Sequence, residues 1–525
     1  MRPPSLLVCA APLLPAAGAQ RPYAMNWSTQ SYGPDGPWQA VAIEIGSNKQ
    51  PIASTQAPPT TPSESNTSIS PQGSSNTSSA WNIFYWNVQG GSRQAVVGDQ
   101  VTWGAEGATI PNVSLTAIYD TYQTYPNGRS YPVSVGNLVL GAPRLRDTAS
   151  GLNMNTLAAW LYTSHHTPSY SYSMHIGSVS PRIPGSLVLA GYDSTRLLGE
   201  ASSQPVVDST GILQIVLRDI GLGVAEGGSP FPSFTASHRG GLFLDDEHET
   251  GGMVLPRLIT IDPTKPYMYL PEATCNAITA FFPVSFHTGL GLYIWDVQSA
   301  EYATLTASPA YVSFTFNKDG SPASGQNLTI RIPLQLLTLT LQEPLVQGQN
   351  LTYFPCFLST DTPVLGRAFL QAAFVAVNWV EGLGNGTWML GQVPGPALFE
   401  KGDGANDQNV TPIAVDHRAL RGSGEGSWAA SWAGNGGISA GAKAGIGVGA
   451  GISGLIITGI AGWVLILRHR KQSIGAAPGK EGYGQPFTEL SAGSTHGQLL
   501  ELACKDTGQP REMEAKDHVR RHELE

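Results

Sequence analysis

The sequence predicts an all-β protein built from two related lobes. Short apolar and β-branched runs extend from about residue 36 to about residue 400, and Gly-, Asn- and Pro-containing turns such as Pro126-Asn127-Gly128 separate them. Many short strands with rare helices are typical of large antiparallel sheets. Two runs, 135–142 and 362–369, share an apolar-apolar-Gly form, which favours two lobes of one design. The best helical segments are 157–164, 273–282 and 365–373.

The composition is typical of an extracellular protein. Only 13% of the 525 residues are charged, and Gly and Pro are abundant, which does not suit a helical cytosolic enzyme. The formal net charge of −9 argues against a nucleic-acid partner.

The N-terminus predicts a signal peptide over residues 1–19. Arg2 precedes an apolar run over 6–14, and Ala17-Gly18-Ala19 fits a small-residue cleavage site. The ectodomain then spans residues 20–400. Its first strand is predicted over 36–46, where Val, Ile and Ile alternate with Ala, Ala and Glu before a glycine.

Residues 51–80 predict a disordered insert in the ectodomain. Fourteen of these 30 residues are Ser or Thr and five are Pro. Such a segment buries too little apolar surface to offset the entropy lost on ordering, and its composition indicates O-glycosylation. Strand signals resume at 81–86.

Three segments follow the ectodomain. Residues 401–443 predict a Gly/Ser-rich stalk, 444–467 a transmembrane helix of 24 uncharged residues, and 468–525 a disordered cytoplasmic tail. The basic cluster over 468–471 marks the cytoplasmic end of the helix. We therefore expect a single-pass type I protein of the plasma membrane, in contact with the lipid bilayer. Small residues spaced four apart from Gly445 also allow pairing of two helices into a homodimer.

Eight N-x-S/T sequons precede the apolar helix and predict N-glycosylation on the lumenal side. They begin at Asn26, Asn66, Asn76, Asn112, Asn327, Asn350, Asn385 and Asn409. Cys9 leaves with the signal peptide and Cys504 falls in the tail, so Cys275 and Cys356 remain as the ectodomain pair. In an oxidising compartment we expect these two cysteines to form a disulfide.

Four stretches occur in a characteristic order: 36–46, 185–193, 258–271 with Cys275 after it, and 363–370 with Cys356 before it. In their order and spacing they resemble the pepsin-like (A1) aspartic peptidases, particularly the membrane-anchored fungal members. Residues 170–176 are also similar to the family's strand before the crossover between lobes. The resemblance covers roughly residues 34–396. It implies a bilobed acid-protease fold with a cleft between the lobes and one Asp-Thr/Ser-Gly turn in each lobe.

The catalytic motifs depart from the pattern of the family. Its chemistry needs two carboxylates that share one proton, so that one activates water while the other polarises the scissile carbonyl. Between Glu44 and Asp99 there is no Asp, so the first motif is missing. Asp262 takes the place of the second-lobe Asp, but Pro and Thr follow it, and Pro offers neither a hydroxyl nor an N–H. Tyr85 is the nearest counterpart of the flap tyrosine.

We therefore interpret Asp262 as a remnant that is inactive alone. The sequence predicts a non-catalytic surface glycoprotein, without a cofactor, that binds, anchors or senses an extended peptide or a cell-wall polymer. The alternative is a membrane-anchored aspartic endopeptidase of the cell surface or secretory pathway. A third interpretation is that residues 47–80 derive from a misplaced intron boundary that hides a real motif, which transcript sequencing would decide.

Other patterns have ordinary structural interpretations, and no metal site is predicted. The acidic run 245–249 lacks the spacing of metal ligands and predicts a solvated loop. His165 and His166 lack a further ligand at suitable spacing and predict surface histidines. The glycine-rich run 221–227 predicts a connection between the lobes.

Overall fold

The structure is a computed structural model, and it describes much of the chain from residue 20 to residue 432. The described residues are 20–47, 50–51, 88–89, 93–103, 108–119, 122–132, 135–141, 146–147, 154–207, 211–244, 257–320, 325–379, 386–396, 409–415, 419–423 and 428–432. They are mostly β-strand, which confirms the predicted fold class at that level.

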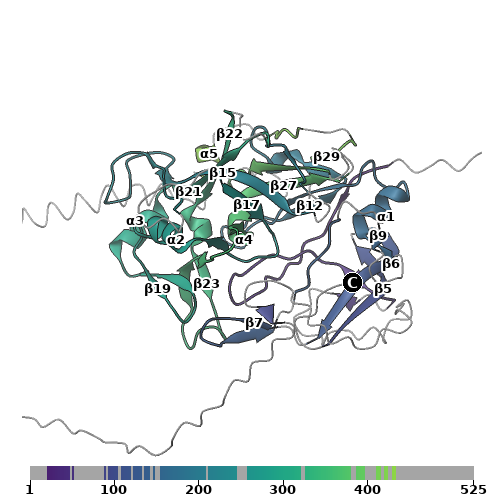
Figure 1. The fold of residues 1–525 in the computed structure, drawn as a ribbon, viewed down its shortest axis with the longest axis horizontal. Helices are drawn as coiled ribbons and strands as arrows, with labels where there is room; N and C mark the ends of the chain where they lie inside the picture. Colours follow the sequence, from purple (N-terminus) through teal and green to yellow (C-terminus); the bar gives the residue numbers. More distant parts are fainter. Residues whose placement is uncertain are drawn as a thin grey trace, which may run out of the picture. The chain divides into compact units, whose positions relative to one another are not determined.

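One six-stranded sheet combines strands from both halves of the chain. Its order is β1 (Tyr23–Ala24), β12 (Ser186–Leu189), β11 (Ser171–His175), β27 (Ala373–Asn378), β28 (Thr387–Gln392) and β14 (Gln204–Pro205). Strands β11 and β27 are antiparallel, with Tyr172 opposite Val377. Figure 1 shows β12 and β27 in this layer, and β11 lies between them in the sheet order. The two halves are therefore joined by backbone hydrogen bonds across the sheet.

The first half of the chain also forms two separate sheets. The larger has the order β3 (Gln50–Pro51), β2 (Glu44–Ile45), β5 (Arg93–Trp103), β6 (Ala108–Tyr119), β10 (Met154–Asn155) and β9 (Arg146–Asp147). The smaller contains β4 (Val88–Gln89), β7 (Tyr122–Thr124) and β8 (Ser130–Pro132). Helix α1 (Leu157–Thr163) packs next to β6 and buries Leu157, Ala159 and Leu161, as expected for the predicted helix.

The second half is built on an eight-stranded sheet. Its order is β22 (Asn327–Pro333), β21 (Ala310–Asn317), β15 (Leu213–Val224), β17 (Arg257–Ile261), β26 (Val364–Leu365), β18 (Met268–Leu270) and β25 (Cys356–Leu358), with β16 (His238–Arg239) added to β15. A four-stranded sheet lies beside it: β19 (Val284–His287), β20 (Leu292–Trp295), β24 (Leu351–Phe354) and β23 (Leu339–Leu341). One apolar core continues from the first half into the second.

Strand β26 fixes the turn that follows β17. It runs parallel to β17, with Leu365 opposite Ile261, and antiparallel to β18. The turn over 262–267 therefore crosses the end of β26. A Cβ on Gly366 would lie 2.2 Å from the Lys265 carbonyl oxygen, so the turn fits here only because residue 366 lacks a side chain.

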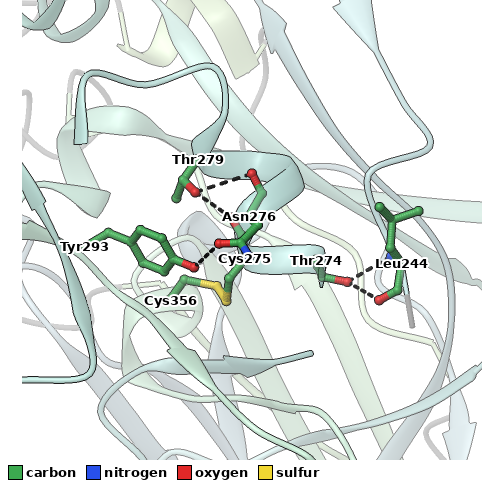
Figure 2. The surroundings of a disulfide bond; sticks show 7 residues. All are labelled: Leu244, Thr274, Cys275, Asn276, Thr279, Tyr293 and Cys356. Atoms are coloured by element: carbon green, nitrogen blue, oxygen red, sulfur yellow. Dashed lines mark hydrogen bonds between the residues drawn. A yellow bond between two sulfur atoms is a disulfide. The ribbon is translucent and has the colours of Figure 1, made fainter. Parts of the chain in front are cut away.

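A disulfide ties the second half together, as predicted. Cys275 on α2 (Glu272–Thr279) is bonded to Cys356 at the start of β25, 81 residues later. Figure 2 shows how the surrounding side chains hold the helix: the Asn276 side chain accepts a hydrogen bond from the Tyr293 hydroxyl at 2.6 Å, and Thr274 bonds to the backbone of Leu244.

The remaining described elements are short. They are the helices α3 (Ala300–Ala307), α4 (Arg367–Leu370) and α5 (Trp428–Trp432), the 3₁₀ turns Ser194–Arg196 and Leu334–Leu337, and the paired strands β13 (Gly191–Asp193) and β29 (Val410–Pro412).

Three predicted elements differ in the structure. The strand over 36–46 is reduced to β2, because the preceding residues pair singly with 26–32, as in the hydrogen bond from Ala42 N to Asn26 O. The helix over 365–373 is reduced to α4, because Val364 and Leu365 join the sheet instead. The glycine-rich run 221–227 begins inside β15, where Gly223 leaves room for the Tyr311 ring, so it is not a connection between lobes.

Several sequence predictions fall outside the described residues. They are the signal peptide 1–19, most of the insert 51–80, the run 81–86, most of the stalk 401–443, the helix 444–467 and the tail 468–525. In the part of the chain that the structure describes, no helix has both the length and the apolar character needed to cross a membrane.

Candidate functional site

The Asp262 carboxylate is held by its own turn. Asp262 follows the last residue of β17, and its backbone N–H donates to Leu365 O on β26 at 3.1 Å. Its Oδ1 accepts from the Thr264 backbone N–H at 2.9 Å and also from the Thr264 hydroxyl. A carboxylate that bonds its own backbone two residues on is the usual device of an Asx turn. The turn therefore orders this carboxylate without help from the first half of the chain.

A cavity of about 200 Å³ lies beside this turn. One wall comes from the second half of the chain and contains Pro263, Thr264, Arg367 and Gln371. The other walls come from the first half, from segments 37–43, 135–140 and 174–179 with Trp27 and Leu187. Most of the lining side chains are aliphatic or aromatic, so the cavity is an apolar space with a few polar groups, as is common for ligand sites.

Among the described residues that line the cavity, Arg367 is the one that carries a charge. Its guanidinium carbon lies 4.9 Å from the centre of the Trp38 ring, and its Nη1 donates to Thr264 O at 3.1 Å. Its Nε is buried and meets no acceptor among the described residues, and no described carboxylate forms an ion pair with it. The cavity therefore has a cation held in place at one wall with unused donor capacity.

The other polar side chains that line the cavity already have partners. Gln39 bridges the first-half wall, accepting from Gly185 N and donating to Ile183 O. Gln371 accepts from the Ser178 hydroxyl at 2.7 Å and donates to Leu336 O at 2.9 Å. The bond between Ser178 and Gln371 joins the two walls. Arg367 is left as the described lining group with the greatest unmet hydrogen-bonding capacity.

A second carboxylate, Asp35, lies fully buried near this cavity. The Trp38 indole N–H donates to its Oδ1 at 3.1 Å. The hydroxyls of Tyr131, Tyr267 and Tyr125 approach its Oδ2 at 3.1, 3.2 and 3.4 Å. Burial removes the water that would solvate a carboxylate, and three phenols and an indole take its place as hydrogen-bond partners.

The Asp35 cluster joins three distant parts of the chain. Tyr125 and Tyr131 come from the β7–β8 hairpin, while Tyr267 and Tyr353 come from the second half. The Tyr353 hydroxyl donates to the backbone oxygen of Asp35. Backbone bonds from Thr340 and Gln342 to the flanking residues Gly36 and Pro34 fix the loop against β23. The loop is therefore held on all sides by the second half and the hairpin.

Burial dominates the protonation behaviour of these tyrosines. It raises the pKa of Tyr125, Tyr131, Tyr267 and Tyr353 well above 10, and the nearby Asp35 charge raises each pKa further. The phenols consequently remain protonated donors throughout the physiological range.

A contact chain links Asp35 to Asp262. Asp35 bonds the Trp38 indole, the Trp38 ring stacks on Arg367, Arg367 bonds Thr264 O, and Thr264 bonds Asp262. No hydrogen bond joins the two carboxylates in the described structure, and each has its own set of donors. An arrangement in which two carboxylates share one proton is therefore absent at these residues.

His175 is hydrogen-bonded to the backbone of Gln371, a residue that lines the cavity. It is fully buried on β11, and its Nε2 lies 3.0 Å from the Gln371 carbonyl oxygen. Burial, aided by the Arg196 charge, lowers the pKa of His175 to about 3. The ring is therefore neutral and donates to Gln371, which lines the cavity.

The structure places the other predicted site residues as follows. Asn26, Asn327, Asn350 and Asn409 are exposed and Asn112 is partly buried, while Asn66, Asn76 and Asn385 lie outside the described residues. Tyr85 and the acidic run 245–249 also lie outside them. His165 and His166 are exposed, as predicted. No group of three or more potential metal ligands occurs in the described part of the chain.

Sequence reasoning missed Asp35, Trp38 and Arg367 as functional candidates. Asp35 lies in Gly33-Pro34-Asp35-Gly36-Pro37, where turn residues ordinarily indicate a solvated carboxylate. The sequence signal that could have indicated burial of Asp35 is Trp38, three residues later. Arg367 lies within the second apolar-apolar-Gly run, but nothing in that run indicates that it faces a cavity.

Comparison with known proteins finds a similarity in structure but none to a family model or a curated sequence. No protein-family model matches the sequence, and no curated protein matches it. Among solved structures the chain is similar to the aspartic proteinase from Irpex lacteus, with a TM-score of 0.42 and 14% identity over 71% of this chain and 98% of that one.

Proposed function

We propose that the protein is a single-pass type I cell-surface glycoprotein whose pepsin-like ectodomain binds a ligand and does not cleave it. The observation that carries the proposal is the cavity beside Asp262: among the described residues that line it, the charged one is a cation, Arg367, where aspartic peptidase chemistry would need a second carboxylate. The cavity supports a binding role, and the signal peptide and apolar helix expected from the sequence support anchoring or sensing at the cell surface.

The chemistry of peptide hydrolysis supports this proposal. Two like charges held close force the carboxylates to share a proton, which supplies an acid and a base at one pH. Asp262 instead has its carboxylate bonded to Thr264, and the contact chain next to it leads to a guanidinium. A guanidinium in the lining of the cavity favours anionic ligands.

The alternative, an aspartic endopeptidase, has one specific observation in its favour. Asp35 is a second aspartate on the same contact chain: burial raises the pKa of Tyr269, and the charges of both aspartates raise it further. If a substrate displaced Trp38 and Arg367, the two carboxylates would become the candidate pair.

The two functions are separated by an assay for cleavage of casein at acid pH. Full-length protein is incubated with and without a pepstatin-type inhibitor, alongside the variants Asp262→Ala and Asp35→Asn. The proposal predicts no inhibitor-sensitive cleavage by any form. Inhibitor-sensitive cleavage that both variants abolish would establish the endopeptidase.

Anchoring and glycosylation need their own test. Treatment of the protein from intact cells with peptide N-glycosidase should increase its electrophoretic mobility, and external protease should remove the ectodomain while leaving an epitope in 468–525 intact. A protein without attached glycans, or a protected ectodomain, would contradict the proposed topology.

A further inference from the structure

We propose that the cavity beside the Asp262 turn binds a small carboxylate with an aryl or alkyl body, and that Arg367 pairs with its carboxylate group. The inference rests on the proposed binding role and names the class of ligand.

The size of the cavity limits the ligand. An apolar cavity of about 150 Å³ holds a benzene molecule. The cavity here has about 200 Å³, enough for a ring or a short alkyl chain with one polar group attached. An extended peptide would reach beyond it, so one apolar side group or a free small molecule fits best.

The lining supplies the matching apolar surface. The ring of Trp38 and the side chains of Val41, Ile43, Leu140 and Met174 come from separate segments of the first half and meet at this space. Filling such a space with an apolar body removes that surface from water, which provides most of the binding free energy of small ligands.

The hydrogen-bond donors that have no acceptor favour a ligand with a carboxylate group. Among the lining groups, Gln39, Ser178 and Gln371 are bonded to protein acceptors and donors. Among the described residues, the buried Nε of Arg367 and the buried indole N–H of Trp27 meet no acceptor. Both are donors and both residues line the cavity, so the lining favours a ligand that accepts hydrogen bonds over one that only donates.

Arg367 is positioned in advance for this role. The stacking on Trp38 and the bond to Thr264 O restrict its side chain, so little entropy is lost when an anion binds. A planar guanidinium also matches a carboxylate in a paired, two-bond geometry.

The test uses 4-phenylbutyrate and its neutral isostere 4-phenylbutyramide, titrated calorimetrically into full-length protein in lipid nanodiscs. We expect the carboxylate to bind about ten-fold to a hundred-fold more tightly than the amide, as charge-assisted hydrogen bonds provide. Arg367→Met should abolish that preference, and Arg367→Lys should retain part of it. If Arg367→Met fails to fold, the Arg367→Lys variant still decides, because it loses the Trp38 stacking but keeps the charge.

Arg239→Met is the matched control. Arg239 stacks on Phe281 at the same 4.9 Å but does not line the cavity, so this variant should bind like the wild type. Equal affinity for carboxylate and amide, or binding of neither, would overturn the inference. Those results, obtained with no cleavage of casein, would leave the non-catalytic role standing; cleavage would overturn that role whatever the ligand.

Discussion

Asp35 is the residue whose surroundings most limit what this protein can do. It is fully buried, and the donors that reach its carboxylate are phenols and an indole. Those donors come from the hairpin and from the second half, so the carboxylate serves as a shared acceptor that fixes their relative positions. The same bonds occupy both oxygens of the carboxylate.

Replacing Asp35 should therefore destabilise the fold. In Asp35→Asn one carboxylate oxygen becomes an NH₂ group that faces phenol donors, leaving buried hydroxyls unpaired. We expect a loss of about 2–4 kcal/mol in the free energy of unfolding. Denaturant titration measures it, with Asp361→Asn as the control because Asp361 is exposed. An unchanged midpoint for Asp35→Asn would show that the cluster does not depend on the carboxylate.

His175 should make the fold sensitive to acid. Its pKa falls from 6.5 in the unfolded chain to about 3 in the fold, so the neutral ring stabilises the fold above pH 6.5. That stability is lost as the pH falls from 6.5 toward 3, by about 1.4 kcal/mol for each pH unit. Unfolding measured between pH 7 and pH 5 should therefore show a loss of about 2 kcal/mol.

His175→Gln keeps a side-chain donor for Gln371 but does not titrate, so this loss should disappear in the variant. His166→Gln, at an exposed position, should retain it. An identical acid limb in wild type and His175→Gln would mean that other groups cause the pH dependence.

At the scale of elements, the three-strand crossing of β17, β26 and β18 is what holds the Asp262 turn. Gly366 is its most sensitive point, because a Cβ there would meet the carbonyl oxygens of Lys265 and Tyr267 at 2.2 and 2.6 Å. In the first half, residues 135–141 carry the equivalent apolar-apolar-Gly run but form no strand. That run lines the cavity instead.

Gly366→Ala should destabilise the protein by about 2–4 kcal/mol, since backbone atoms cannot move aside as a flexible side chain does. Gly228→Ala is the matched control, because a Cβ at Gly228 would meet nothing within 4 Å. Thermal unfolding of the two variants measures the difference. Equal melting temperatures would show that the crossing tolerates a side chain at residue 366.

The sequence predicted those elements whose signals are local. The helix over 157–164 follows from a short-range pattern and the Cys275–Cys356 bond from cysteine number, while the strand at 171–175 was expected only from the resemblance of 170–176 to a strand of the pepsin-like family. The predicted strand over 36–46 was wrong because its backbone forms isolated pairs with 26–32. The alternation of apolar and polar residues along the sequence cannot reveal such tertiary pairing. Asp35 was missed for the same reason, since the phenols that reach its carboxylate come from residues 90 to 232 positions away.

At the scale of the whole molecule, both halves share one core and one six-stranded sheet, and the cavity lies where their walls meet. The second-half wall brings a turn with one aspartate and a cation, and the first-half wall brings apolar side chains. A site assembled this way recognises an apolar anion better than it activates water.

The most direct test of the proposed non-catalytic role is a mass-spectrometric survey of a diverse peptide mixture after incubation with the full-length protein at several acid pH values. The peptide mixture contains a wider range of peptide-bond sequences than casein does. Circular dichroism at each pH confirms that the protein is folded, which the expected effect of His175 makes necessary. We predict the same peptides with and without the protein. New peptide termini that are absent with Asp262→Ala and in the presence of a pepstatin-type inhibitor would contradict the account.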